Sequence, residues 1–117
     1  MFFAALASAF SLSAGCGGGP NMPAGCPKDP PQTCPSPAPA YAANVAPVIQ
    51  SRCAICHRPG GIQETVPFQT YDQVQMWQVG IKAMLEACMM PPADQPQPTQ
   101  QQWRAILGWI ACGAMNN

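Results

Sequence analysis

The sequence has 117 residues, which suits one domain of the usual ~100–150 residues and excludes a large multidomain enzyme. Only 9% of the residues are charged, with five Lys and Arg against five Asp and Glu, so no basic face is available for a phosphate backbone and nucleic acid is not expected as a partner. Seven Cys are many for this length, and they indicate either an oxidising compartment or cysteines that bind a ligand.

Residues 1–16 are predicted to be an export signal. Residues 2–14 are uncharged and mostly Phe, Ala, Leu and Ser, a run too short for a membrane span of ~20 residues. The segment that follows, Leu12-Ser13-Ala14-Gly15-Cys16, resembles the lipobox of bacterial lipoproteins. The resemblance implies a lipid anchor on Cys16 and a periplasmic or outer-envelope location. The alternative is an ordinary cleaved signal peptide, with Cys16 free or removed.

Residues 17–40 are predicted to be a linker. They include eight Pro and four Gly, which disfavour both helix and sheet, and such a chain tends towards an extended tether. Cys26 and Cys34 lie inside this segment. We expect a local Cys26–Cys34 disulfide, with intermolecular pairing as the alternative.

Residues 41–117 are predicted to form a helical domain. A first short helix presents one apolar face and can hold Pro47 in its first turn; that face consists of Val45, Val48, Ile49 and Cys53. A second helix has Thr70 as its N-cap and continues as one apolar stripe to Cys88. A third helix starts with a Thr99–Gln102 capping box and ends at Gly113. Since no stretch alternates with a period of two, the predicted fold class is all-α.

The one histidine of the chain closes the motif Cys53-Ala54-Ile55-Cys56-His57. C-x-x-C-H is the attachment pattern for c-type haem, in which two thiols add to the vinyl groups and the adjacent imidazole binds the iron. The two-residue gap lets both sulfurs reach the same porphyrin edge. We therefore predict one covalent haem c on Cys53 and Cys56, with His57 as the proximal iron ligand.

Three other interpretations of this motif fit the sequence less well. A zinc site would need Cys88 and Cys112 as further ligands, although these lie far apart in the sequence. A thioredoxin-like dithiol belongs to a βαβ unit, which the helical pattern does not contain. A plain Cys53–Cys56 disulfide would leave His57 without a role.

A six-coordinate haem iron needs a second axial ligand, and no other histidine is present. Met90 is the best candidate because Pro91 and Pro92 follow it and would fix an extended loop across the distal face. The alternatives are the neighbouring Met89 and an open sixth position. The remaining methionines of the helical region are expected to fill the core; these are Met76, Met84 and Met115.

The helical region resembles the small class I cytochrome c domains of bacteria, from about residue 42 to 114. The resemblance is carried by the haem motif, Pro67-Phe68 with Tyr71, Met90-Pro91-Pro92, Trp109-Ile110 and Gly113-Ala114. It implies three to five short helices around one haem, and electron transfer between donor and acceptor proteins. It also implies that the carbonyl of Pro67 accepts from the second ring nitrogen of His57, with Pro59 as a rival.

Cys88 and Cys112 fall on the apolar faces of the last two predicted helices. In an exported protein we expect a Cys88–Cys112 disulfide, with two buried free thiols as the alternative. The leading functional hypothesis is an electron carrier rather than an enzyme, because no paired carboxylates, catalytic triad or phosphate loop accompanies the haem motif. The alternatives are a haem-based sensor that binds a small ligand at an open sixth position, and an interaction module without haem.

Overall fold

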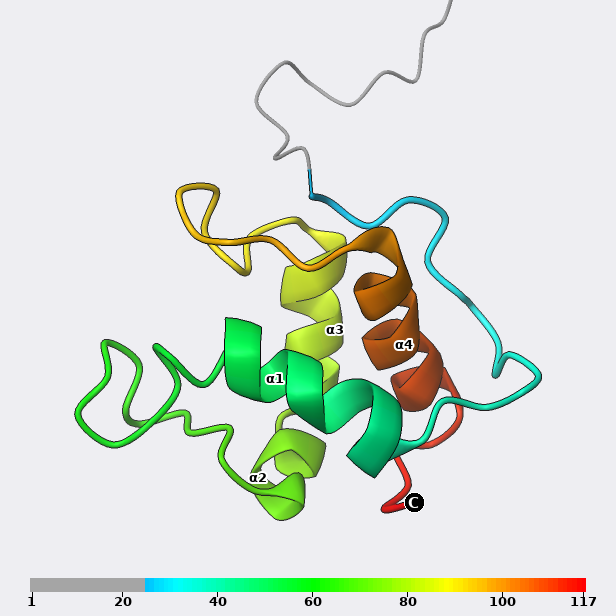
Figure 1. The fold of residues 1–117 in the computed structure, drawn as a ribbon, viewed down its shortest axis with the longest axis horizontal. Helices are drawn as coiled ribbons and strands as arrows, with labels where there is room; N and C mark the ends of the chain where they lie inside the picture. Colours follow the sequence, from blue (N-terminus) through cyan, green and yellow to red (C-terminus); the bar gives the residue numbers. More distant parts are fainter. Residues whose placement is uncertain (1–24) are drawn as a thin grey trace, which may run out of the picture.

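The computed structural model describes residues 25–117, and these residues form helices joined by loops, with no strand among them (Figure 1). The elements in chain order are a π-helical turn η1 (Tyr41–Val45), α1 (Ala46–Arg52), α2 (Tyr71–Met76), α3 (Gln78–Glu86) and α4 (Gln100–Ala111). This agrees with the predicted all-α class. The predicted export signal, Cys16 and residues 17–24 of the predicted linker lie outside the described residues. Within residues 25–117, no helix has the length and apolar character needed to cross a membrane.

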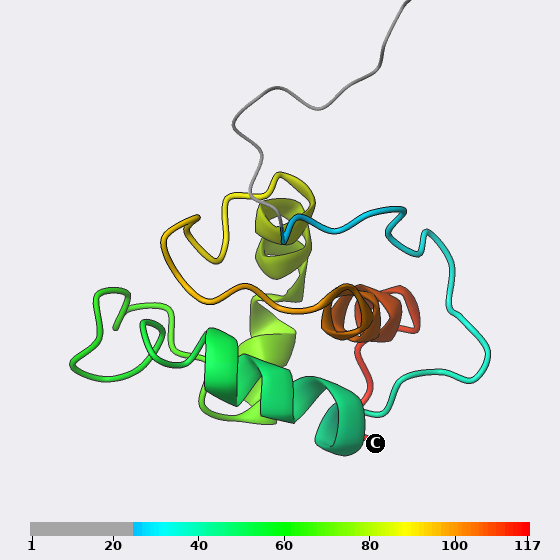
Figure 2. The ribbon, with the colours of Figure 1, turned by 45° about the horizontal axis from the view of Figure 1, so that its top comes forward.

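Helices α3 and α4 lie side by side, and α1 crosses one face of the pair (Figures 1 and 2). The turn η1 packs against α4, where Tyr41 meets Trp109 with ring centroids 5.2 Å apart. Tyr71 of α2 approaches the same Tyr41 edge-on at 5.1 Å, and its hydroxyl donates to the Ala114 carbonyl over 2.8 Å. This aromatic cluster therefore holds both ends of the helical region together.

The predicted N-cap at Thr70 and the predicted Thr99–Gln102 capping box are both confirmed, and Thr70 forms a capping box as well. The Thr70 hydroxyl accepts from the Gln73 backbone N–H, and the Gln73 side chain accepts from the Thr70 N–H. Thr99 and Gln102 form the same reciprocal pair at the start of α4. Each pair satisfies backbone donors that the first helical turn would leave unbonded. Pro47 lies in the first turn of α1, also as predicted.

The second predicted helix is wrong as a single element, because it is divided at Trp77. Trp77 has φ −96° and ψ 6°, and it serves as the last cap of α2 and the first cap of α3. The Ile81 N–H still bonds the Trp77 carbonyl over 2.8 Å, and Val74 and Ile81 are both buried. The apolar spacing thus continues across the break, so it cannot distinguish a divided helix from a straight one.

Helix α4 ends as its sequence predicts, in a left-handed residue at Gly113, whose φ is 92°. The Gly113 N–H bonds the Ile110 carbonyl, and the Ala114 N–H bonds the Trp109 carbonyl, each over 3.0 Å. This is the Schellman pattern, which satisfies the last carbonyls of a helix and favours glycine because a side chain is strained at positive φ.

Helix α3 ends in the same pattern with a cysteine in the glycine position. Cys88 has φ 58°, its N–H bonds the Leu85 carbonyl over 3.1 Å, and the Met89 N–H bonds the Met84 carbonyl over 2.9 Å. A glycine would relieve the backbone strain but would remove the sulfur that bonds Cys26. Cys88 therefore occupies a backbone position that favours glycine because its sulfur is needed for the disulfide.

The structure contains two disulfides, Cys26–Cys88 and Cys34–Cys112, with Cα atoms 5.4 Å and 4.5 Å apart. The predicted pairs Cys26–Cys34 and Cys88–Cys112 are therefore wrong, and so is the alternative of two free thiols. Cys88 is bonded to Cys26, whose carbonyl accepts from Gln100 at the start of α4, whereas Cys112 caps the end of α4. Cys88 and Cys112 therefore lie at opposite ends of this helix. The eight residue-to-residue steps from Cys26 to Cys34 span up to ~25 Å when extended, enough to run the length of α4.

Residues 25–40, called the strap below, are irregular, as their proline content predicts, but they are not a free tether. The Lys28 N–H donates to Gln100 Oε1 over 2.9 Å, and Gln100 Nε2 donates to the Cys26 carbonyl over 2.9 Å. Further along, the strap crosses Gly108 so closely that a Cβ there would lie 3.0 Å from the Pro35 ring. The strap is therefore part of the folded body.

Candidate functional site

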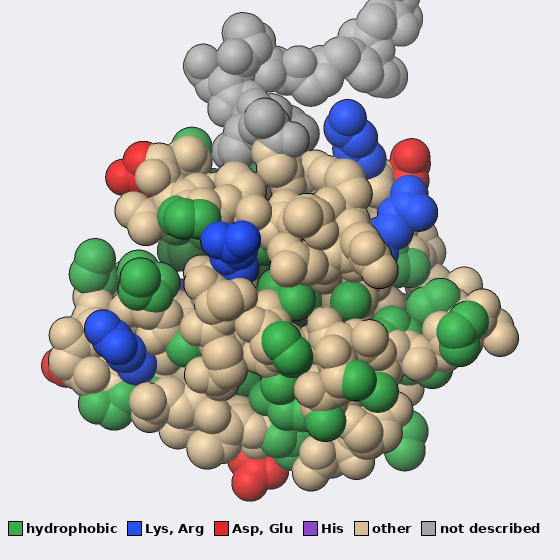
Figure 3. All heavy atoms as spheres, in the orientation of Figure 1, with side chains coloured by type: hydrophobic (Ala, Val, Ile, Leu, Met, Phe, Trp, Pro, Cys, Tyr) green, Lys and Arg blue, Asp and Glu red, His purple; other side chains and the backbone are tan. Residues whose placement is uncertain are grey.

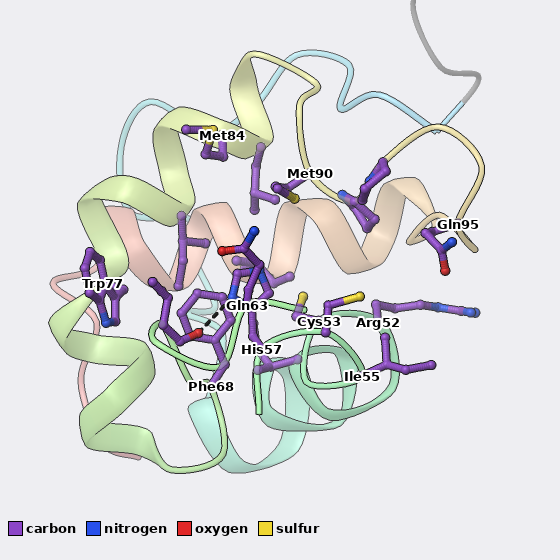
Figure 4. Close-up of a pocket in the computed structure, with 18 of the residues that line it drawn as sticks. Arg52, Cys53, Ile55, His57, Gln63, Phe68, Trp77, Met84, Met90 and Gln95 are labelled. Carbon is purple, nitrogen blue, oxygen red and sulfur yellow. Dashed lines mark hydrogen bonds between the residues drawn. The ribbon is translucent and has the colours of Figure 1, made fainter. Parts of the chain in front are cut away.

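A cavity of about 400 Å³ opens between α1, α3 and the loops that follow them (Figure 4). Its wall comes from residues 49–68, from Trp77 and α3, from residues 90–96, and from Ile106 of α4. Most of these side chains are apolar. The polar ones are few: Ser51, Arg52, His57, Gln63 and Gln95, besides the two cysteines. A volume of this size with sparse polar groups is typical of a site for a small molecule or cofactor.

The three residues of the C-x-x-C-H motif all line this cavity. They lie in the turn that follows α1, where the N–H groups of Cys56 and His57 both bond the Cys53 carbonyl, over 3.2 Å and 3.0 Å. Cys53 and Cys56 are half-buried, and they are the free thiols among the described residues. The turn therefore places both thiols and the imidazole at one wall, as the motif predicts.

The ring of His57 is held by two neighbours. Nδ1 lies 2.8 Å from the Val66 carbonyl, and because a carbonyl only accepts, Nδ1 carries the proton and the lone pair belongs to Nε2. The Phe68 ring stacks on the imidazole. The expected carbonyl of Pro67, with Pro59 as its rival, is therefore wrong, and the acceptor is the carbonyl one residue before Pro67. Nε2 is left free to bind a metal.

Met90 contributes to the wall across the cavity from His57 and Cys53 (Figure 4). It is half-buried and packs against the core, whereas Met89 is 61% exposed and does not contribute to the wall. Of the two methionines that the sequence offers as ligands, the fold thus brings Met90 to the cavity. Its thioether sulfur and the imidazole of His57 face a shared apolar space.

Met76, Met84 and Met115 do not fill the core, contrary to the expectation. Met76 is 74% exposed and Met115 is 64% exposed, so both lie at the surface. Met84 is 46% exposed and lines the cavity. The expectation came from the general tendency of methionine to fill cores, which does not hold at these three positions.

Burial changes the chemistry of one motif thiol. The pKa of the Cys53 thiol rises to about 12, chiefly because burial disfavours the thiolate and also because Cys56 lies nearby. Without a covalent partner, Cys53 therefore stays protonated at neutral pH. At the same wall, the Nε of Arg52 is buried without a hydrogen-bond partner among residues 25–117.

The residues that the competing interpretations of the motif require are bonded elsewhere or are not brought together. The zinc site required Cys88 and Cys112, and both are bonded in disulfides to the strap. Among the described residues, no three His, Cys, Asp or Glu side chains gather as a metal cluster. Cys53 and Cys56 are not bonded to one another.

Sequence reasoning missed part of the cavity wall. Trp77, Ile81 and Leu85 line it, and their spacing was visible as an apolar stripe, but nothing in the stripe distinguishes a cavity wall from a packed core. The Gln63 side chain also projects into the space in Figure 4. A single glutamine in a loop gives no sequence signal.

Comparisons with known proteins identify no relative: no protein-family profile, no curated protein and no solved structure matches this chain.

Proposed function

We propose that this protein is a mono-haem c-type cytochrome that carries electrons between donor and acceptor proteins and is not an enzyme. The observation that carries the proposal is the gathering of Cys53, Cys56, His57 and Met90 around one apolar cavity. In this proposal the two thiols hold haem c covalently, His57 is the proximal ligand of the iron, and Met90 is the distal ligand.

The residues present fit this group. Cys53 and Cys56 are free and lie at the wall that holds His57, as attachment at two vinyl groups of one porphyrin edge requires. His57 has its Nδ1 proton bound by the Val66 carbonyl, which leaves Nε2 as the ligand atom. Met90 stands across the cavity from it.

Haem, when bound, supplies a one-electron exchange between ferric and ferrous iron. The role of the protein is then to hold the ligands rigidly and to set the potential. Phe68 and the Val66 carbonyl fix the imidazole, and the apolar wall disfavours the extra charge of ferric iron. With a thioether as the second ligand, we expect a moderately high reduction potential.

The mouth of the cavity offers a surface for a redox partner. Ile55 is 57% exposed and Ile62 is 85% exposed, and both border the cavity. Charged side chains on the face in Figure 3 are few and separated, with apolar side chains exposed between them. These features favour close contact through an apolar patch rather than long-range attraction.

The cysteines support a proposal for the location. Two disulfides indicate an oxidising compartment. We propose export to the periplasm or outer envelope, with a lipid anchor on Cys16. Since the strap belongs to the folded body, only residues 17–24 separate this anchor from it, so the domain would stand at most ~32 Å from the membrane surface.

The test is an absorption spectrum of the protein produced in a host that matures c-type cytochromes. We expect covalently retained haem and, in the ferric form, the far-red sulfur-to-iron band. Met90→Ala should abolish that band, and Met89→Ala should leave it intact. A high-spin spectrum that shifts with carbon monoxide would favour the ligand sensor, and failure to attach haem would favour the interaction module.

A further inference from the structure

The loop that carries Met90 is held by one side chain. This distal loop, residues 89–98, has no helix or strand. The side-chain amide of Gln97 donates to the Pro92 carbonyl over 2.8 Å and to the Gln95 carbonyl over 2.9 Å, and it lies 3.4 Å from the Pro91 carbonyl. An amide NH2 group has two hydrogens, so the two short bonds use both of them.

The composition of the distal loop explains why a side chain is needed. Four of its ten residues are prolines, which have no backbone N–H to donate. Between backbone groups of the loop, the Gln95 N–H bonds the Pro92 carbonyl over 2.9 Å. Gln97 therefore supplies the donors that a proline-rich loop lacks, and it does so for the residues directly after Met90.

Gln97 is itself fixed from the outside. The backbone of Gly25 lies directly against the Gln97 side chain, and a Cβ at Gly25 would overlap its stem. The next strap residue, Cys26, is bonded to Cys88, which precedes Met90 by two residues. The strap thus packs against Gln97 on the side away from the distal loop, and its disulfide to Cys88 fixes the chain just before that loop.

We infer that Gln97 is a positioning residue for Met90. By binding the carbonyls of the turn that follows Met90, its amide holds the loop in the form that places the thioether opposite His57. This inference rests on the proposed function, in which Met90 is the distal iron ligand. Loss of the Gln97 donors frees the loop, so Met90 leaves the iron more often.

The test uses the full-length, haem-loaded protein and three variants. Gln97→Glu keeps the size of the side chain but has no donor when ionised, and Gln97→Met keeps the size without charge or donor. Gln101→Glu adds the same charge at an exposed position of α4 and is the control. The readouts are the ferric sulfur-to-iron band and the rate at which added imidazole binds. Imidazole can bind the iron only after Met90 has dissociated, so its rate reports how often Met90 leaves.

At pH 7 we expect both Gln97 variants to weaken the band and to bind imidazole about thirtyfold faster, the factor for the loss of two net hydrogen bonds. Lowering the pH towards 4 should partly restore the band in Gln97→Glu, since a protonated carboxyl regains one donor, but not in Gln97→Met. The band alone is the readout at this pH, because imidazole is then protonated and cannot bind iron. Wild-type rates in both variants, with the band intact, overturn the inference alone. A wild-type protein without the band overturns the proposed ligation by Met90 and the inference with it.

Discussion

The Phe68 ring stacks on the imidazole of His57, with ring centroids 4.2 Å apart and planes 16° apart. The Phe68 N–H also donates to the His57 carbonyl over 2.9 Å, so backbone and side chain act together. Phe68 is almost fully buried in the core cluster. The hydrogen bond from Nδ1 to the Val66 carbonyl restrains the imidazole within its plane, and the Phe68 ring restrains it perpendicular to that plane. A ligand atom fixed in this way needs little reorganisation when the charge on a bound metal changes.

Replacing Phe68 should therefore weaken the fold and loosen the imidazole. We expect Phe68→Ala to lower the free energy of unfolding by about 3–5 kcal/mol, the usual cost of removing a buried aromatic ring. Phe68→Leu fills most of the space and should cost less. Urea unfolding of both variants measures the difference. Equal, small losses would mean that the ring does not contribute to the core.

Local features of this molecule could be predicted from the sequence, and features that depend on which helix ends meet could not. The capping residues Thr70 and Thr99 act on backbone groups within three residues, so their pattern is sufficient. The same holds for the turn at Cys53 that gathers the motif. The cysteine pairing depends on the antiparallel arrangement of α3 and α4, which separates Cys88 from Cys112 and cannot be read from apolar spacing.

The two disulfides should each be important for stability. Cys26–Cys88 and Cys34–Cys112 close loops with sequence separations of 62 and 78 residues. Loop-closure entropy then predicts a loss of about 4 kcal/mol for each bond removed as a pair of serines. Thermal unfolding of the two double variants tests this value.

Peptide mapping without reduction tests the pairing itself. We expect one fragment that joins Cys26 to Cys88 and a second that joins Cys34 to Cys112. A fragment that joins Cys26 to Cys34 would contradict the arrangement of the strap along α4.

The N-cap of α4 should contribute measurably to stability. The Thr99 hydroxyl accepts from the Gln102 N–H over 3.2 Å, and Thr99→Ala removes this acceptor while the Gln102 side chain remains. We expect a loss of about 0.5–2 kcal/mol in the free energy of unfolding. Thr65→Ala, at an exposed loop position, is the control and should change little. Equal effects of the two substitutions would mean that the Thr99 cap does not contribute to stability.

The Cys53 thiol should show its raised pKa directly in protein exported without haem maturation. With Cys56→Ser to leave Cys53 as the one free thiol of residues 25–117, alkylation of Cys53 should be slow at pH 8 and should rise about tenfold per pH unit towards pH 12, because only the thiolate reacts. In denaturant the same thiol should react readily near pH 9. Fast alkylation of the folded protein at pH 8 would contradict the burial of Cys53.

The raised pKa of Cys53 also makes the stability of the fold depend on pH. Between pH 9 and about 12 the unfolded thiol ionises while the folded one keeps its proton, so the unfolded state binds fewer protons. The free energy of unfolding should therefore fall as the pH rises through this range, and Cys53→Ala should remove that part of the slope. A thioether has no proton to lose, so covalent attachment of haem at Cys53 should also remove the contribution of Cys53 to the slope. The dependence of stability on alkaline pH therefore measures haem attachment without a spectrum.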